Sequence, residues 1–288
     1  MSDNMSLVLE LQELFKNNEM SINTKKTYQT SYNRLVNSGL FSKSITETPN
    51  LEIIENIKSI TDKAESRNAL ITICVRLKKN AEKSIIELEH FRVQNNTDRL
   101  NEIKTKKPDM ISDGITLKTL LDNEEVLYNS KLYVKYIVNY LMNHYGVRNQ
   151  DVNVLIIKNR KSIIPNENYL LVRKTKIEYI RDNYKTKSVY GVKEITIKDK
   201  KFINTVLQLE RQEGEPLLKT QRGERLSSES QNRVIQDLTY NGLGEGRICK
   251  ILVGEYKYDD AKLNELSNTR GTNRADIMKH YTTEDLTI

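Results

Sequence analysis

The chain has 288 residues, of which 37% are hydrophobic and 30% charged, and it carries a formal net charge of +7. This length exceeds what one small core usually holds and predicts two domains in a helix-rich globular protein. The positive charge favours a polyanionic partner, and the absence of an apolar run near ~20 residues or of a signal-peptide pattern predicts an intracellular protein with no membrane partner.

The cysteine content argues against a disulfide framework or a zinc site. Cys74 and Cys249 lie far apart in the sequence and are expected to be free thiols in a reducing compartment. Neither has the CxxC or His-rich surroundings of a zinc site. No P-loop, dinucleotide-binding or paired-carboxylate motif occurs, so we expect no metal and no cofactor.

The first part of the chain is predicted to be an all-helical domain over residues 1–104. Ser21 is a candidate N-cap, and Gly39 is placed to end the helix that Ser21 begins. The predicted helices are, in chain order, 7–18, 22–38, 50–59, 65–78 and 81–95.

A change in composition then predicts a linker over residues 105–110. The segment Lys104–Asp109 is polar, charged and interrupted by Pro108. Such a linker would let two domains close around a duplex, although an ordinary surface loop explains the composition as well.

Residues 111–288 are predicted to form a second domain that is mainly helical, with one small antiparallel sheet. Periodic apolar and tyrosine positions predict helices over 116–123 and 127–145, and Gly146 supplies a stop. Strand-like runs follow over 152–157, 169–172 and 188–197. Further helices are expected over 200–210 and 228–240, and the rest is expected to be mostly helical to about residue 280.

Three basic residues and one tyrosine in this second part match the needs of metal-free phosphodiester cleavage. They are Arg148, Lys185, Arg247 and Tyr281. A planar, permanently charged guanidinium grips phosphate oxygens bidentately, so two arginines suit the charge that builds on them in the transition state. A lysine can protonate the leaving 5′-oxygen, and a tyrosine can act as nucleophile.

This order and spacing resemble the active site of the tyrosine recombinases, the phage-integrase superfamily. Gly146–Asp151 resembles the family's Gly-x-Arg-x-x-Glu box, with Asp151 in the acidic position that orients the arginine. The resemblance implies a two-domain clamp, double-stranded DNA as partner, and a 3′-phosphotyrosyl intermediate on Tyr281. It also implies a lysine on a β-hairpin. Residues 183–197 resemble that hairpin; Lys185 is preferred, with Lys187 and Lys193 as rivals.

Two positions depart from the family pattern. Gly244 stands where the family's His-x-x-Arg box has histidine, and Thr272, nine residues before Tyr281, stands where histidine or tryptophan is usual. Both family residues hydrogen-bond the phosphate or handle the tyrosine proton. Neighbours that could replace them are Lys250, Arg270 and His280.

The N-terminal helix over 22–38 resembles the first long helix of the family's core-binding domain, where a Ser-x-x-Thr-x-x-x-Tyr pattern recurs. Here Ser21, Thr24 and Tyr28 form that pattern. The resemblance assigns Lys25, Lys26 and Arg34 to DNA binding. A solvated basic helix that packs one apolar stripe is the alternative.

The leading hypothesis is a site-specific recombinase or integrase from a virus or mobile element. Two alternatives stay open: a type IB topoisomerase-like enzyme, and a DNA-binding protein of the same fold that has lost catalysis. Strand exchange would require a homo-oligomer on DNA. Only seven residues follow Tyr281, which favours a monomeric enzyme or a contact made elsewhere.

Overall fold

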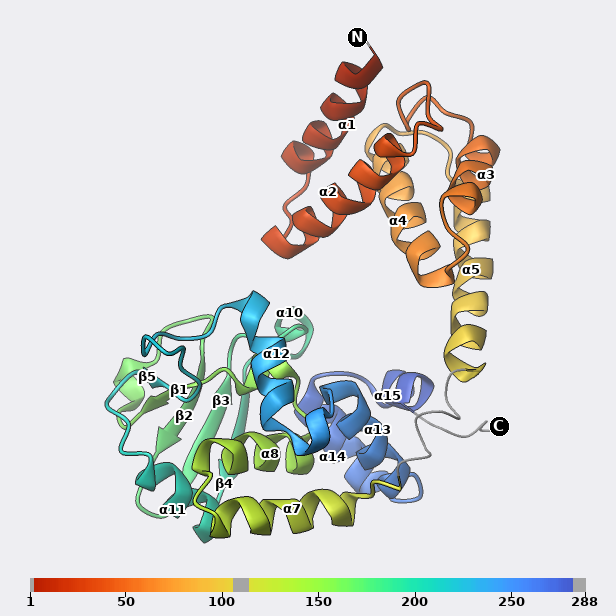
Figure 1. Cartoon of the computed structure of the whole chain (residues 1–288). Coiled ribbons are helices and arrows are strands. Elements are labelled where there is room, and N and C mark those ends of the chain that lie inside the picture. Colours follow the sequence, from red (N-terminus) through yellow and green to blue (C-terminus); the bar gives the residue numbers. More distant parts are fainter. Residues whose placement is uncertain (1–2, 106–113, 282–288) are drawn as a thin grey trace. The chain divides into compact units, whose positions relative to one another are not determined.

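A computed structural model describes residues 3–105 and 114–281, and its chain divides into two compact units, Met1–Ser112 and Asp113–Ile288 (Figure 1). The predicted linker over residues 105–110 lies outside the described residues, except for Thr105, which is the last residue of a helix. Each unit has a hydrophobic core of its own.

The secondary structure described in the first unit, over residues 3–105, is entirely helical. They are α1 (Asp3–Asn17), α2 (Ile22–Asn37), α3 (Asn50–Ile60), α4 (Ala64–Asn80) and α5 (Ile86–Thr105). Ser21 caps α2, because its side chain accepts a hydrogen bond from the Thr24 amide at 3.1 Å. Tyr32 and Leu35 face the core from the same helix. The predicted N-cap and buried stripe of this helix are therefore confirmed.

The second unit combines helices with one small sheet. Its larger helices are α7 (Leu117–Asn129), α8 (Tyr133–Tyr145), α11 (Lys200–Gln208), α12 (Ser228–Leu238), α13 (Glu245–Tyr256), α14 (Asp260–Arg270) and α15 (Arg274–Tyr281). Short helical turns are α9 (Asn149–Val152), α10 (Lys187–Tyr190), η1 (Arg160–Ser162) and η2 (Tyr240–Gly242). The strands are β1 (Leu155–Ile157), β2 (Asn168–Val172), β3 (Ile177–Arg181), β4 (Lys193–Ile197) and β5 (Glu215–Pro216).

The described strands form one five-stranded sheet in the order β4-β3-β2-β1-β5. β1 and β2 run parallel, while the other neighbouring pairs are antiparallel. The prediction of a mainly helical chain with a small sheet is confirmed, but the sheet is mixed and not wholly antiparallel. After β1 the chain passes through η1 and enters β2, which runs beside β1 in the same direction.

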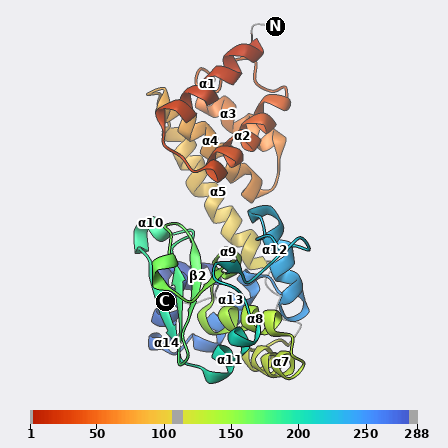
Figure 2. The same ribbon diagram turned by 90° about the vertical axis from the view of Figure 1, so that its left-hand side faces the viewer.

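Buried apolar side chains lie on both faces of the sheet, which Figure 2 shows beside helices such as α8 and α13. On one face, Leu170 and Tyr179 belong to the main core with helices such as α8 and α11. On the other face, Tyr169, Leu171 and Ile180 form a small cluster with Ile157. Burial on both sides explains why β2 reads as a continuous apolar run instead of an alternating one.

Several predictions of helices and strands are wrong. The helix expected over 127–145 begins inside α7, and the break falls later, where Lys131 adopts a positive φ of 57°. The strand expected over 188–197 is α10 followed by β4, separated by Gly191. β3 has no counterpart among the predicted strands, because its Glu178 and Arg181 obscure the apolar alternation.

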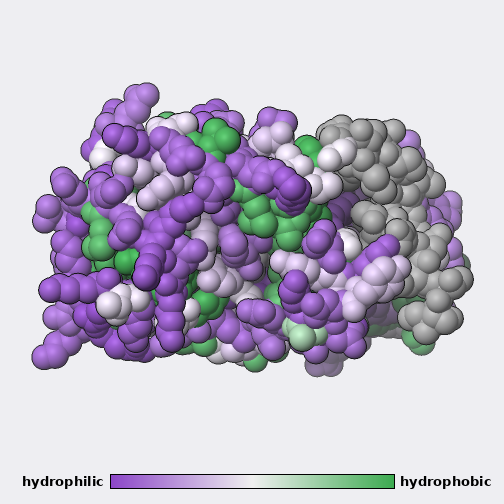
Figure 3. Space-filling view, turned by 90° about the horizontal axis from the view of Figure 1, so that it is seen from below, coloured by the Kyte–Doolittle hydropathy of each residue, from purple (hydrophilic) through white to green (hydrophobic). Residues whose placement is uncertain are grey.

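The two cysteines are free thiols, as the sequence predicts. Cys74 and Cys249 are free and buried. On the face drawn in Figure 3 hydrophilic residues predominate, and hydrophobic residues form small separate patches. Within residues 3–105 and 114–281, no helix has both the length and the apolarity needed to cross a bilayer.

Gly146 ends α8 in a left-handed conformation, with φ of 57°. A β-carbon there would lie 2.4 Å from Leu266 Cδ1 and 3.3 Å from Leu252 Cδ1. We therefore expect Gly146→Ala to destabilise the protein by about 2 kcal/mol or more, measured by chemical denaturation, from backbone strain and overpacking together.

Gly254, inside α13, is the matched control for this prediction. A β-carbon at Gly254 meets nothing within 4 Å. Gly254→Ala should therefore be neutral or stabilising by up to about 1 kcal/mol, because alanine favours the helix. Equal stabilities of the two alanine variants would contradict the packing argument.

Candidate active site

Arg148 lies in the short connection between α8 and α9. Its backbone amide donates to Asp151 Oδ2 at 3.2 Å, which closes the first turn of α9. Its side chain is partly buried, and Nη1 donates to the backbone carbonyl of Arg270 at 2.8 Å. Burial, followed by the positive charge of Arg270, lowers the pKa of Arg148. The guanidinium thus stands among groups from distant parts of the sequence.

Arg270, the last residue of α14, joins these groups to the tyrosine. Its side chain is 2% exposed, and Nη1 donates to the Gly146 carbonyl. Nη2 donates to Glu245 Oε1 at 3.2 Å and to the Tyr281 hydroxyl at 3.0 Å. The guanidinium carbon also lies 5.1 Å from the centre of the Tyr281 ring. Arg148, Arg270 and Tyr281 therefore belong to one cluster.

Glu245, the first residue of α13, supplies negative charge to this cluster. Besides Arg270, its carboxylate accepts a hydrogen bond from the Asn149 amide, one residue after Arg148. Glu245 therefore fixes the backbone beside Arg148 and partly balances the charge of Arg270.

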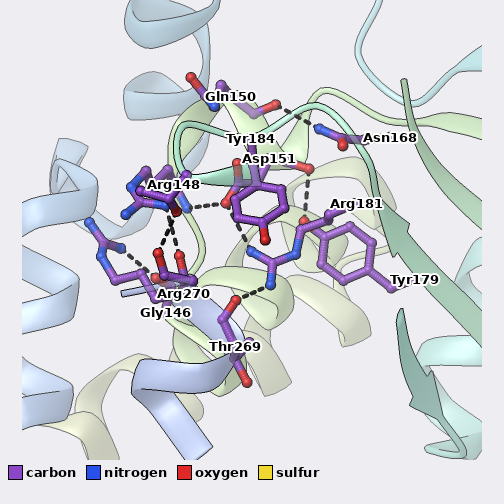
Figure 4. A network of polar contacts seen from close by, with 12 residues as sticks. Gly146, Arg148, Gln150, Asp151, Asn168, Tyr179, Arg181, Tyr184, Thr269 and Arg270 are labelled. Atoms are coloured by element: carbon purple, nitrogen blue, oxygen red, sulfur yellow. Dashed lines mark hydrogen bonds and ion pairs between the residues drawn. The ribbon is translucent and has the colours of Figure 1, made fainter. Parts of the chain in front are cut away.

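A second ion pair lies behind Arg148 (Figure 4). Asp151 Oδ2 lies 3.0 Å from Arg181 Nη1, and both side chains are 0% exposed. Burial raises the pKa of Asp151, and Arg181 and Arg148 oppose that shift. The carboxylate that the sequence assigns to orienting Arg148 does contact the Arg148 backbone.

Lys185 lies in the turn between β3 and α10, and its side chain is exposed. Its two neighbours are anchored: a β-carbon on Gly271 would lie 2.5 Å from the Tyr184 ring, and Thr186 Oγ1 donates to the Gly271 carbonyl. Because Gly271 follows Arg270, this anchoring brings the lysine turn, defined as residues 182–186, to the end of α14.

The two rival lysines have other partners. Lys187 Nζ lies 2.6 Å from Asp182 Oδ1 and donates to Asn166 Oδ1 at 2.9 Å. Lys193 lies on β4, with its ammonium 5.5 Å from the centre of the Tyr190 ring. Lys185 stays the preferred lysine.

Arg247 lies in the first turn of α13, two residues after Glu245, and is partly exposed. Lys250 lies one turn further along the same helix and is also partly exposed. Arg270, one of the three residues considered as replacements, donates to the Tyr281 hydroxyl. Thr272 lies in the bend after α14, where its amide donates to the Ser267 carbonyl, and His280 is exposed.

The three candidate DNA-binding residues of α2 lie in the first unit. Lys26 and Arg34 are exposed, whereas Lys25 is partly buried, with its ammonium 5.7 Å from the Phe15 ring centre. Arg34 lines a shallow hollow with Thr30 and Asn33. Lys26 and Arg34 are therefore the exposed members of the three.

Sequence reasoning missed Arg181 and Glu245. Arg181 carried a usable signal, because residues 177, 179 and 181 point to one face of a strand, and Ile177 and Tyr179 are core residues. No sequence signal marks Glu245, since a glutamate at the start of a helix usually interacts favourably with the helix dipole.

In the part of the chain that the structure describes, no group of three or more His, Cys, Asp or Glu side chains could hold a metal ion.

No protein-family model matches the sequence, and no curated protein matches it. Among solved structures, the chain is similar to XerA recombinase over 98% of its own length and 94% of that chain, with a TM-score of 0.38 and 13% identity. A likeness at this level carries no information about the roles of individual residues.

Proposed function

We propose that the protein cleaves and rejoins DNA strands through a 3′-phosphotyrosyl bond to Tyr281, as a site-specific recombinase or integrase. The observation that carries this proposal is the contact of the Tyr281 hydroxyl with the buried Arg270, whose carbonyl holds Arg148. A phenol beside two guanidinium groups has the surroundings that attack on a phosphodiester requires.

In the proposed step, the Tyr281 oxygen attacks phosphorus and the bond from phosphorus to the 5′-oxygen breaks. The phenol proton leaves toward Glu245, whose carboxylate shares the Arg270 guanidinium with the phenol. Lys185 supplies the proton that the departing 5′-oxygen takes up. The energy of the broken linkage is kept in the phosphotyrosyl bond, so rejoining needs no nucleotide.

Arg148 and Arg247 are assigned to the phosphate. Arg148 is partly exposed, which leaves room for an anion beside its guanidinium. Asp151 orients Arg148 through its backbone amide. Lys26 and Arg34, with Lys25, are assigned to binding DNA outside the reacting phosphate.

The proposal predicts a covalent adduct between the protein and DNA. The test is incubation with nicked suicide substrates of varied sequence, followed by denaturing electrophoresis. Protease digestion and mass spectrometry should then find DNA on a peptide that contains Tyr281 and its α15 neighbours Ile277 and Met278.

Two other outcomes are informative. An adduct on Tyr256 or Tyr258 would keep the class of enzyme and reject the nucleophile. Tight DNA binding without an adduct on any substrate would favour a DNA-binding protein that has lost catalysis.

A further inference from the structure

We infer that Arg181 is a positioning residue that holds together the three segments carrying Arg148, Arg270 and Lys185. This inference rests on the proposed function for its catalytic consequence. Arg181 is the last residue of β3 and is 0% exposed. Its guanidinium carbon lies 5.5 Å from the centre of the Tyr179 ring and 5.3 Å from that of the Tyr184 ring.

The first connection runs to Arg148. Arg181 Nη1 donates to Asp151 Oδ2 at 3.0 Å, and the same oxygen accepts from the Arg148 amide at 3.2 Å. The Tyr179 hydroxyl also donates to the Asp151 carbonyl at 2.8 Å. Asp151 is therefore held by β3 on both its side chain and its backbone, and it fixes the turn on which Arg148 stands.

The second connection runs to the end of α14. Arg181 Nη2 donates to the carbonyl of Thr269, which immediately precedes Arg270. Carbonyls in the last turn of a helix have no partner within the helix. Arg181 satisfies one of them, as Figure 4 shows. It thereby fixes the backbone from which Arg270 reaches Tyr281.

The third connection runs to the lysine turn. Tyr184, which packs on Arg181, also packs so closely on Gly271 that a β-carbon there would lie 2.5 Å from the ring. Thr186 donates to the Gly271 carbonyl. The residues on either side of Lys185 are thus held against the same backbone that Arg181 anchors.

A buried ion pair is weak evidence for stability, because desolvation of the two charges offsets their attraction. The Arg181–Asp151 pair joins segments that are 30 residues apart in sequence, and the bond to Thr269 spans 88. The more specific effect of these Arg181 contacts is to set the relative positions of the segments that they join. Misplacing a catalytic group by about 1 Å can cost about 100-fold in rate.

The test compares Arg181→Gln with Arg225→Gln under single turnover at saturating DNA. Arg225 is a matched control in the same unit, since it pairs with Glu167 and donates to the Asn153 carbonyl. We expect Arg181→Gln to slow adduct formation about 10- to 100-fold with DNA affinity nearly unchanged. Arg225→Gln should keep the parent's rate, and equal rates for both variants would overturn the inference.

A double variant separates positioning from charge balance. Arg181→Gln with Asp151→Asn removes both buried charges, so thermal stability should recover relative to Arg181→Gln. The rate should stay low, because the bond to the Thr269 carbonyl is still lost. If the double variant recovered the rate together with the stability, the role of Arg181 would be only to balance the charge of Asp151, and the inference would be overturned.

Hydrogen exchange gives a readout that does not depend on activity. In Arg181→Gln, amides in residues 145–152 and 266–272 should exchange faster than in the parent, measured against α11 as internal reference. Unchanged exchange in both segments would overturn the inference. If these segments loosen and the parent itself forms no adduct, the coupling stands and the proposed function fails.

Discussion

Tyr281→Phe is expected to abolish the covalent adduct while leaving DNA affinity and folding close to those of the parent. The change removes one oxygen and keeps the ring, which packs against the core of the second unit. Arg270 loses its bond to the phenol but keeps Glu245 and the Gly146 carbonyl. The loss of stability should therefore be about 1 kcal/mol. Adduct yield on a nicked suicide substrate measures the chemistry.

Tyr258→Phe is the matched control, because Tyr258 is 88% exposed and lies just beyond α13. That variant should form the adduct at the parent's rate. Suicide substrates are preferable to turnover assays here, since they trap the adduct even when turnover is slow. Adduct formation by Tyr281→Phe at an undiminished yield would reject the nucleophile.

Arg148→Ala is expected to slow strand cleavage by about 100- to 1,000-fold while DNA binding is largely retained. A phosphate clamp acts mainly on charge that develops in the transition state, and removal of one such donor typically has an effect of this size. Single-turnover adduct formation at saturating DNA measures the loss. Arg148→Lys should recover little, because an ammonium lacks the bidentate geometry of guanidinium.

Arg160→Ala provides the control for this second prediction. Arg160 is about half exposed and pairs with Glu178 and Glu194 on the sheet. Solvent screens exposed pairs of this kind, so the loss of Arg160 should affect neither folding nor cleavage appreciably. Cleavage by Arg148→Ala at the parent's rate would show that the cluster around Arg270 is structural.

Gly244 and Thr272, the two positions at which the sequence differs from the recombinase pattern it resembles, both lie at helix ends. Thr272 follows Gly271, which has a φ of 64°, and its amide donates to the Ser267 carbonyl at the end of α14. Arg270, the residue before this bend, donates to the Tyr281 hydroxyl. Gly244 serves as the N-cap of α13, and the adjacent Glu245 provides the contact to Arg270.

The sequence by itself determined the features that depend on neighbours along the chain. The Ser21 cap, the stop at Gly146 and the apolar periods of α2 and α8 follow from hydrogen bonds and packing within a few residues, so local reasoning finds them. The order of Arg148, Lys185, Arg247 and Tyr281 is likewise visible in the sequence, and their joint role stays a prediction.

Tertiary structure alone decided which charged side chains meet. Arg148 and Arg270 are 122 residues apart, and Arg181 and Thr269 are 88 apart. The sequence around these arginines does not show which partners they meet, because a guanidinium is buried only where folding brings carbonyls and carboxylates to it. The same holds for Lys185 and Lys187, which have the same local character until Asp182 and Asn166 engage one of them.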